Sequence, residues 1–315
     1  MKRIVLASTL VAVVLAHAAC NRTASNAPGG APRIALVLKT LNSPFFNDMQ
    51  RGAQEAATRL GVNLVVQAAE REIDVDRQMQ IVENLLQTGI QALCLTPAGS
   101  RELVPAVVKA NQSKVPVVIV DTRLDPAASS EAAVKTASFI GSDNYEGGRI
   151  AARFIVDQSR GKANVAVLEG IPGHETGDSR LRGFRDGIKD SPGIRIVASQ
   201  PANWERDQGF NVFQNMLQAH PDLDTLFACN DMMALGAVEA IRAAGRSASI
   251  RVVGFDAVDD ARKAIRDGAI AGSVAQFPDE MGRMAVEHAF RAIKGEPVPP
   301  EEKVRIELIT REQVK

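Results

Sequence analysis

Short apolar segments alternate with longer amphipathic segments along almost the whole chain from residue 33 onward. The apolar segments carry Val, Ile and Leu at consecutive positions, which is typical of strands that are buried on both faces. The predicted strands are Arg33–Lys39, Asn63–Ala69, Gln91–Thr96, Pro116–Asp121, Ala137–Gly141, Ala163–Glu169, Ile194–Ser199, Thr225–Cys229, Ile250–Phe255 and Ile270–Ala275. Strand and helix repeat at intervals of roughly 25–30 residues, which predicts an α/β fold with parallel sheets.

These strands are too numerous for one compact half, so the pattern predicts two similar parallel-sheet lobes. The first lobe is expected to comprise residues 33–141 and 277–304, and the second residues 142–276 and 305–315. The chain would then cross between the lobes three times, last along the C-terminal strand Lys303–Ile309. Three crossings predict a three-segment hinge.

Residues 1–19 have the composition of a secretory signal peptide. Lys2 and Arg3 give a charged start, residues 4–15 are almost wholly apolar, and small residues follow. The apolar run is short for a membrane span, which needs about 20 residues, although an N-terminal anchor is the alternative. The segment predicts export to the periplasm.

Cys20 follows two alanines and resembles the lipidated cysteine of bacterial lipoproteins. His17 stands where such sites usually have an aliphatic residue, and Ala16-His17-Ala18 would also serve ordinary signal peptidase. Residues 20–32 are mostly Ala, Ser, Asn, Pro and Gly and predict a flexible tether. We expect a periplasmic protein that touches the membrane only through a lipid on Cys20.

The overall charge and the few cysteines and histidines indicate which partners and cofactors are not expected. The chain has 37 basic and 37 acidic residues and no basic stripe, so nucleic acid is not an expected partner. Cys94 and Cys229 lie at the ends of apolar segments, which predicts buried free thiols. No cysteine or histidine spacing typical of a metal site is present, and neither a metal nor another cofactor is expected.

Polar and aromatic side chains follow the predicted strands at the point where each strand ends. Ligands of open parallel sheets bind beyond the carboxyl ends of the strands. The candidate binding residues at this edge are Lys39, Ser43, Phe45, Phe46, Asp121, Thr122, Arg180, Trp204, Asn230, Asp256 and Gln276.

The residue types in this set predict a monosaccharide site. The chain has only 11 Phe, 1 Tyr and 1 Trp, yet two of the Phe are adjacent at a strand-to-helix turn, Phe45 and Phe46. Aromatic faces stack on the apolar C–H faces of a sugar, and carboxylates, amides and Arg bond its hydroxyls. Each residue also has a structural alternative: the two Phe could be core, Asn230 or Asp256 could cap helices, and Arg180 and Trp204 could lie on the surface.

Six ordered motifs carry a resemblance to a known family: KTLNSPFF, VVIVDTR, SQPANWERDQG, FACNDMMALGA, VVGFDAVDD and AQFPDEMG. They resemble the ribose- and allose-binding proteins of bacterial ABC sugar importers, over about residues 33–313. The resemblance implies a type I periplasmic-binding-protein fold, no catalysis, and an ABC permease as partner. It implies stacking roles for Phe45, Phe46 and Trp204, and polar contacts from the residues Asp121, Arg180, Asn230, Asp256 and Gln276.

Four positions depart from the ribose-binding pattern. Ser43 stands where Asn is usual, Thr122 where Arg is usual, Lys39 where a small residue is usual and Trp204 where Phe is usual. Lys39 and Trp204 resemble the allose-binding branch. The sequence therefore favours an aldohexose or a pentose of the allose and ribose kind, bound by a monomer.

Three alternative functions differ in partner or chemistry. A sensor would present the bound sugar to a chemoreceptor or histidine kinase. A transcriptional repressor would need a DNA-binding segment before residue 33, where the signal segment stands. An enzyme is disfavoured because the chain has no GxSxG or Walker A motif, and His174-Glu175 in a glycine-rich turn is a weak acid–base candidate.

Overall fold

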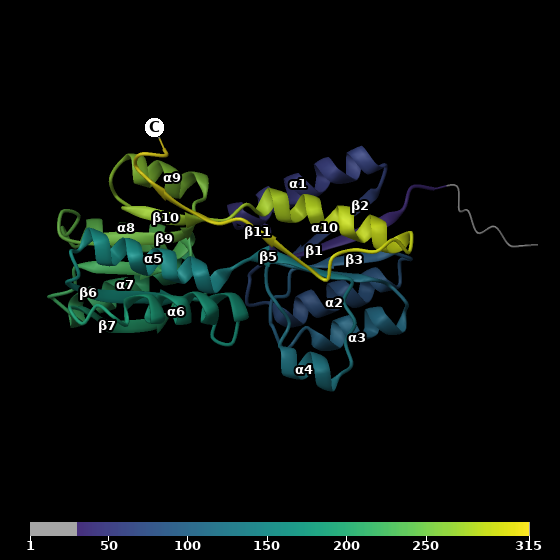
Figure 1. Ribbon diagram of the computed structural model, residues 1–315, viewed down its shortest axis with the longest axis horizontal. Helices are drawn as coiled ribbons and strands as arrows, with labels where there is room; N and C mark the ends of the chain where they lie inside the picture. Colours follow the sequence, from purple (N-terminus) through teal and green to yellow (C-terminus); the bar gives the residue numbers. More distant parts are fainter. Residues whose placement is uncertain (1–29, 315) are drawn as a thin grey trace, which may run out of the picture. The chain divides into compact units, whose positions relative to one another are not determined.

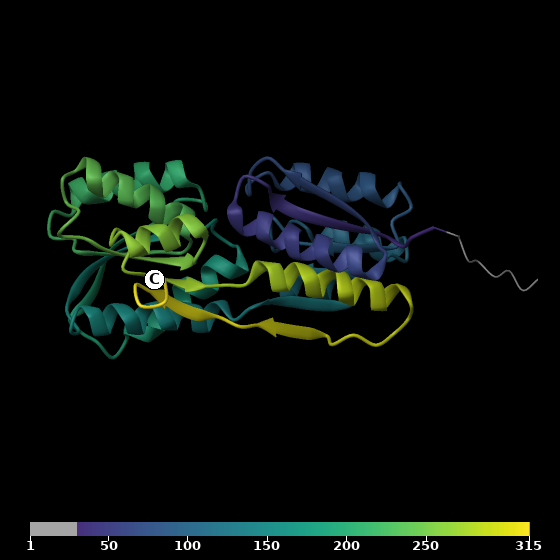
Figure 2. The same cartoon turned by 90° about the horizontal axis from the view of Figure 1, so that it is seen from above.

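The computed structural model describes residues 30–314, which form two α/β lobes (Figures 1 and 2). The predicted signal peptide and Cys20 lie outside the described residues. Each lobe is built on its own six-stranded sheet, with helices packed against it. The predicted fold class is confirmed.

The first sheet has the strand order β11-β5-β4-β3-β1-β2, and all its strand pairs are parallel. Its strands are β1 (Arg33–Thr40), β2 (Asn63–Ala69), β3 (Ala92–Leu95), β4 (Val117–Val120), β5 (Ser138–Ser142) and β11 (Glu301–Val304). The helices of this lobe are α1 (Pro44–Leu60), α2 (Val75–Leu86), α3 (Val104–Gln112), α4 (Pro126–Glu131) and α10 (Pro278–Ile293).

The second sheet has the strand order β12-β10-β9-β8-β6-β7. Its strands are β6 (Ala163–Glu169), β7 (Ile194–Pro201), β8 (Thr225–Ala228), β9 (Arg251–Asp256), β10 (Gly272–Ala275) and β12 (Glu307–Thr310). The helices of this lobe are α5 (Asn144–Gln158), α6 (Glu175–Ile188), α7 (Arg206–Ala219), α8 (Asp231–Ala243) and α9 (Asp259–Arg266). The strands follow the same order in both sheets, and the edge strands β11 and β12 differ only in direction.

Three segments connect the lobes, between β5 and α5, between β10 and α10, and between β11 and β12. The C-terminal strand expected at Lys303–Ile309 is in fact two strands, because the chain leaves the first sheet after Val304 and joins the second at Glu307 (Figure 1). β12 pairs with β10 in the antiparallel sense, which the all-parallel expectation did not include.

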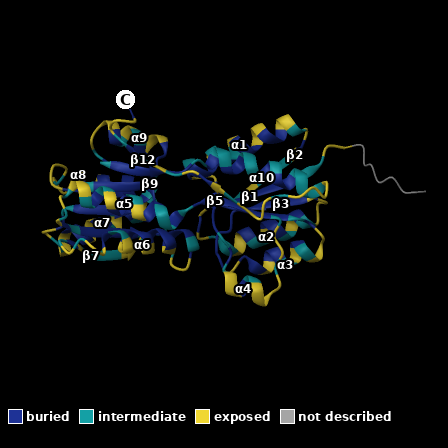
Figure 3. Cartoon of the chain, in the orientation of Figure 1, coloured by how far each residue is buried: buried dark blue, intermediate teal, exposed yellow. Residues whose placement is uncertain are grey.

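The first strand shows why its apolar residues are consecutive. Ile34, Leu36 and Leu38 pack in one hydrophobic cluster with side chains of α1 and α10. Ala35 and Val37 pack in a second cluster with α2 and α3. Side chains alternate across a strand, so helices on both faces require apolar residues at every position. Figure 3 shows the resulting buried strands between helices whose outer faces are exposed.

Helix α1 begins and ends at residue types that are typical of helix termini. Ser43 is the N-cap residue of α1 and Pro44 follows it, but the Ser43 side chain accepts no capping hydrogen bond. Gly61 ends the same helix with a left-handed backbone, φ 66°, as a C-terminal glycine should. Cys94 and Cys229 are buried free thiols, as predicted.

Candidate functional site

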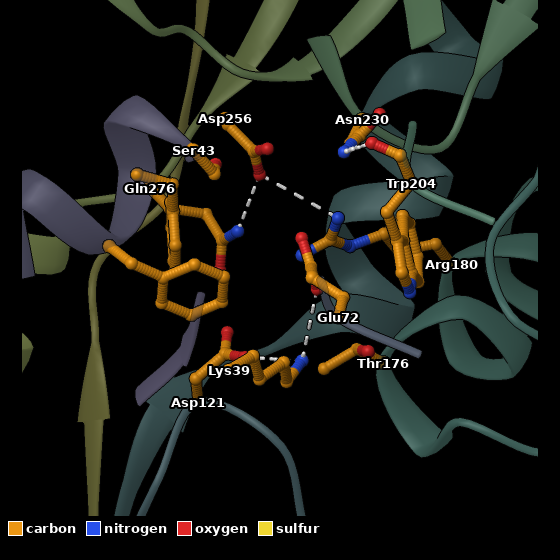
Figure 4. Close-up of a pocket in the computed structure, with 12 residues that line it drawn as sticks. Lys39, Ser43, Glu72, Asp121, Thr176, Arg180, Trp204, Asn230, Asp256 and Gln276 are labelled. Carbon is orange, nitrogen blue, oxygen red and sulfur yellow. Dashed lines mark hydrogen bonds and ion pairs between the residues drawn. The ribbon is translucent and has the colours of Figure 1, made fainter. Parts of the chain in front are cut away.

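A pocket lies between the carboxyl ends of the two sheets and takes its side chains from both lobes (Figure 4). The cavity among these side chains measures about 30 Å³, much less than an occupied small-molecule site. The lining residues are Lys39, Ser43, Phe45, Phe46, Glu72, Asp121, Thr176, Arg180, Trp204, Asn230, Asp256 and Gln276.

The first lobe contributes a buried cluster around Lys39, the penultimate residue of β1. The Lys39 ammonium donates to Asp121 Oδ2 at 3.1 Å and to Thr122 Oγ1 at 2.8 Å, and lies 3.8 Å from Glu72 Oε2. The Thr122 hydroxyl donates to the same Asp121 oxygen at 2.9 Å. The cation is thus neutralised within its own lobe, which buried charges require.

The second lobe contributes a separate buried cluster around Arg180. Its Nη1 donates to the Cys229 carbonyl at 2.7 Å and lies 3.6 Å from Asp256 Oδ1, while its Nε donates to Asn144 Oδ1 at 2.9 Å. Gln276 Nε2 donates to the same Asp256 oxygen at 2.8 Å. Arg180 lies in the second turn of α6 and is buried, which excludes the surface position considered for it, and its side chain reaches the pocket.

Burial and charge shift the pKa values of two carboxyl groups in the pocket. Burial raises the pKa of Glu72 to about 7, and the charge of Lys39 opposes part of that rise. Burial likewise raises the pKa of Asp256 to about 6, against the charge of Arg180. Both carboxyl groups therefore gain or lose a proton close to neutral pH.

Three aromatic side chains lie along the pocket. The rings of Phe45 and Phe46 meet edge to face, with centroids 5.2 Å apart, on the side of the first lobe. The Trp204 ring comes from the second lobe, and the Arg180 guanidinium lies 5.6 Å from its centroid. Phe45 and Phe46 also belong to the hydrophobic core, so the core and pocket interpretations of these residues both apply. Trp204 is buried, which excludes the surface position considered for it.

Three of the lining residues have a left-handed backbone although none is glycine. The φ angles are 64° at Asp121, 68° at Trp204 and 107° at Asp256. Such conformations cost about 1–3 kcal/mol each and persist only where the surrounding structure enforces them. Asp121 and Asp256 adopt them at the ends of β4 and β9, where the chain turns at the pocket.

A second buried carboxylate fixes the loop that carries Asp256. Asp231 accepts from the Val258 amide at 2.9 Å and from the Ser273 hydroxyl at 2.8 Å, and the same hydroxyl accepts from the Ala257 amide at 3.0 Å. Burial, and then the charge of Asp256, raises the pKa of Asp231 well above its usual range. Asp231 is fully buried and does not line the pocket, so it supports the site from behind.

Asn230 combines the two roles between which the sequence could not decide. Its Oδ1 accepts from the Met233 amide at 2.9 Å and caps α8, and its Nδ2 donates to the Trp204 carbonyl at 3.1 Å. It also lines the pocket. Asp256 does not cap α9, whose N-cap residue is Val258.

The structure brings ten of the eleven candidate residues to this pocket and places Thr122 behind it. The Thr122 hydroxyl is occupied by Lys39 and Asp121, so its role is to support them. Sequence reasoning missed Glu72 and Thr176. Glu72 follows β2 at the same edge of the sheet and could have been found by including that strand, whereas Thr176 follows β6 at a distance that carried no signal.

The chemistry of the pocket suits a neutral ligand with many hydroxyl groups. Carboxylates and amides can accept or donate hydrogen bonds, and the aromatic rings offer apolar faces. Gln276 Oε1 is buried and has no hydrogen-bond partner among the described residues, so it can accept from a ligand hydroxyl. Within residues 30–314 no group of His, Cys, Asp and Glu side chains is arranged to hold a metal ion, and no helix is long and apolar enough to cross a membrane.

The Glu72 carboxyl group is expected to titrate near pH 7 in the protein, well above its usual value. Replacing Lys39 by Met should raise the pKa of Glu72 further, because the ammonium stabilises the ionised form. Infrared spectroscopy of the carboxylic acid C=O band against pH measures this, with Glu72→Gln identifying the band. A Glu72 band that titrates at the usual value, or that is unaffected by Lys39→Met, contradicts this account of the cluster.

Comparison with known proteins finds periplasmic binding proteins both by sequence and by structure. The family model of the periplasmic binding protein domain matches residues 34–297. The ribose import binding protein of Salmonella typhimurium is 37% identical over 302 residues, covering 96% of this chain and 98% of that protein. The D-allose-binding periplasmic protein of Escherichia coli is 33% identical, covering 87% of this chain and 88% of that protein.

A similar fold is found in a crystal structure of an ABC transporter periplasmic solute-binding protein from Actinobacillus succinogenes with bound D-allose. It superposes with a TM-score of 0.84 at 36% identity, covering 90% of this chain and 99% of that one. The match spans both lobes and their connections. The chain therefore belongs to the periplasmic-binding-protein family.

Proposed function

We propose that this protein captures a monosaccharide in the pocket between its lobes and delivers it to an ABC permease. Its relatives include ribose import and D-allose-binding proteins over nearly their whole length. Structures similar to this chain hold D-allose and α-D-tagatopyranose. The proposed role is binding and delivery, with no chemical change to the sugar.

The observation that carries this proposal is the composition of the pocket. Aromatic rings from both lobes, Phe45 and Phe46 opposite Trp204, accompany two clusters of ionisable and amide side chains. A sugar ring needs both kinds of partner, since its faces are apolar and its edge carries hydroxyl groups. The candidate residues are proposed to bind it directly, except Thr122, which acts through Lys39 and Asp121.

The proposed ligand is an aldohexose or an aldopentose of the allose and ribose kind. Lys39 places a long cationic side chain at the pocket, and Glu72 stands beside it. Together they offer hydrogen-bonding groups beyond those that a smaller residue at position 39 would supply. This favours a sugar with one more hydroxyl group than a pentose.

Binding is proposed to close two rigid bodies around the hinge, residues 33–141 with 277–304 and residues 142–276 with 305–315. Closure excludes water and strengthens the hydrogen bonds to the sugar. Micromolar affinity needs about 8 kcal/mol, and hydrogen bonds to charged groups contribute roughly 1.5–3 kcal/mol each. Four or five such bonds with stacking therefore suffice after the cost of ordering. The closed form would then be the one that the permease recognises.

A thermal-shift screen over aldopentoses, aldohexoses, ketohexoses and cyclitols tests the proposed ligand class. A sugar that binds only the folded state raises the melting temperature in proportion to its affinity. We expect stabilisation by ribose- or allose-like sugars and quenching or enhancement of Trp204 emission, since this is the only Trp in the chain. A screen in which no monosaccharide stabilises the protein contradicts the proposal.

Replacing Asp121 by Ala should weaken sugar binding by about 2 kcal/mol or more, because it leaves buried donors unpaired. Calorimetry with the sugar found in the screen measures the loss. Asp190→Ala is the matched control, since Asp190 is exposed and outside the pocket. Equal affinities of the two variants would remove Asp121 from the site.

We also propose that a lipid on Cys20 anchors the protein to the membrane after export. The support is the sequence alone, in which a charged and then apolar segment leads to Ala-Ala-Cys. In cells that process lipoproteins, the protein should fractionate with membranes, and Cys20→Ala should release it into the periplasmic fraction. Recovery of the unaltered protein in the soluble fraction would contradict the anchor.

A further inference from the structure

Three polar contacts join the lobes along one rim of the pocket. Arg71 Nε lies 3.2 Å from Glu205 Oε1, and the Glu175 amide donates to Ser100 Oγ at 3.1 Å. The third is the shortest, 2.6 Å between His174 Nε2 and the Ala98 carbonyl. Of these contacts, only the one made by His174 is buried and also reaches a pocket residue.

The partners of His174 determine which of its nitrogens carries the proton. Trp204 Nε1, which can only donate, lies 3.4 Å from His174 Nδ1, so Nδ1 accepts. The Ala98 carbonyl can only accept, so Nε2 carries the proton and donates to it. The imidazole is thus neutral. A second proton would stand on Nδ1 against the indole N–H, where no acceptor is available.

The Trp204 ring has little freedom to move away from this contact. A Cβ atom at Gly170 would lie 1.9 Å from the ring, and one at Gly177 would lie 3.0 Å from it, so the indole packs directly on glycine backbone. The Trp204 backbone is held at a φ of 68°. The orientation of the Trp204 ring is therefore set by its packing on Gly170 and Gly177 and by His174, which accepts from its N–H.

We propose that His174 is a positioning residue that couples closure of the lobes to the placement of the Trp204 ring, and that it does so only in its neutral form. The inference rests on the proposed function, in which closure and the Trp204 ring both serve sugar binding. In the open form His174 would lose the Ala98 carbonyl and become accessible to water. Protonation would then favour the open form.

Some of the groups around His174 lower its pKa and others raise it. Burial is the main cause that lowers the pKa of His174 to about 4, followed by the charge of Lys39, whereas the Ala98 carbonyl and Asp121 raise it. Glu175 and Asp178 stand on its own segment, and Arg71 and Glu205 at the same rim. Because closure lowers the pKa of the His174 imidazole, closure becomes less favourable as the pH falls below 6.5, the ordinary pKa of histidine.

Glu72 and Asp256 impose the opposite pH dependence, because their raised pKa values favour the closed form as pH falls. The effect of His174 must therefore be isolated by comparing variants. His174→Gln retains a side-chain N–H that can donate to Ala98 but does not titrate. His220→Gln is the control, since His220 lies at the end of α7, outside the pocket.

The first measurement is Trp204 emission against pH without sugar, because a protonated imidazole beside an indole quenches its emission. We expect a titration step in the unaltered protein and in His220→Gln that is absent from His174→Gln. With saturating sugar the midpoint of that step should fall by at least about one pH unit. A step that persists in His174→Gln, or a midpoint that sugar does not move, overturns the inference.

The second measurement is sugar affinity by calorimetry at about pH 7.5 and about pH 5. The ratio of the sugar affinity at about pH 5 to that at about pH 7.5 should be larger in His174→Gln than in the unaltered protein, by a factor on the order of 30. Equal changes in the two proteins overturn the coupling. If no monosaccharide binds at either pH, the proposed function fails, and the sugar-free titration still decides whether His174 contacts Trp204.

Discussion

Buried charge in the pocket must be neutralised, and the structure achieves this separately in each lobe. Lys39 is paired with Asp121 and Glu72, all from the first lobe, and Arg180 with Asp256 from the second. Because the ion pairs of these two clusters do not cross the pocket, the lobes can part without leaving the Lys39 or Arg180 charge unpaired. A ligand that joins the two clusters then adds hydrogen bonds to groups that are already in place.

The position of these clusters follows from the topology. Parallel strands bring their carboxyl ends to one edge of each sheet, and the two edges face the same pocket. Left-handed turns at Asp121 and Asp256 then set the carboxylates at the ends of their strands, and the hydrogen bonds of Asp231 maintain the second of these turns. Three of the residues with left-handed backbone, Asp121, Trp204 and Asp256, are thus ones whose side chains line the site.

The sequence was sufficient for the architecture and for most of the candidate site, because both depend on local signals. Consecutive apolar residues predict a doubly covered strand such as β1, and the residue after each strand predicts the pocket edge. The sequence was insufficient where a long-range contact determines which way a side chain points. Thr122 faces Lys39 instead of the pocket, Glu72 reaches the pocket from a loop after β2, and the link from His174 to Ala98 joins residues 76 positions apart.

The central claim is that a sugar lies between the lobes, with its ring faces against the aromatic side chains and its hydroxyl groups on the two charged clusters. A crystal structure of the protein with the best-binding monosaccharide tests it most directly. The account predicts the sugar among Phe45, Phe46 and Trp204, with oxygen atoms within hydrogen-bonding distance of Asp121, Arg180 and Asp256. A sugar bound at any other surface would contradict it.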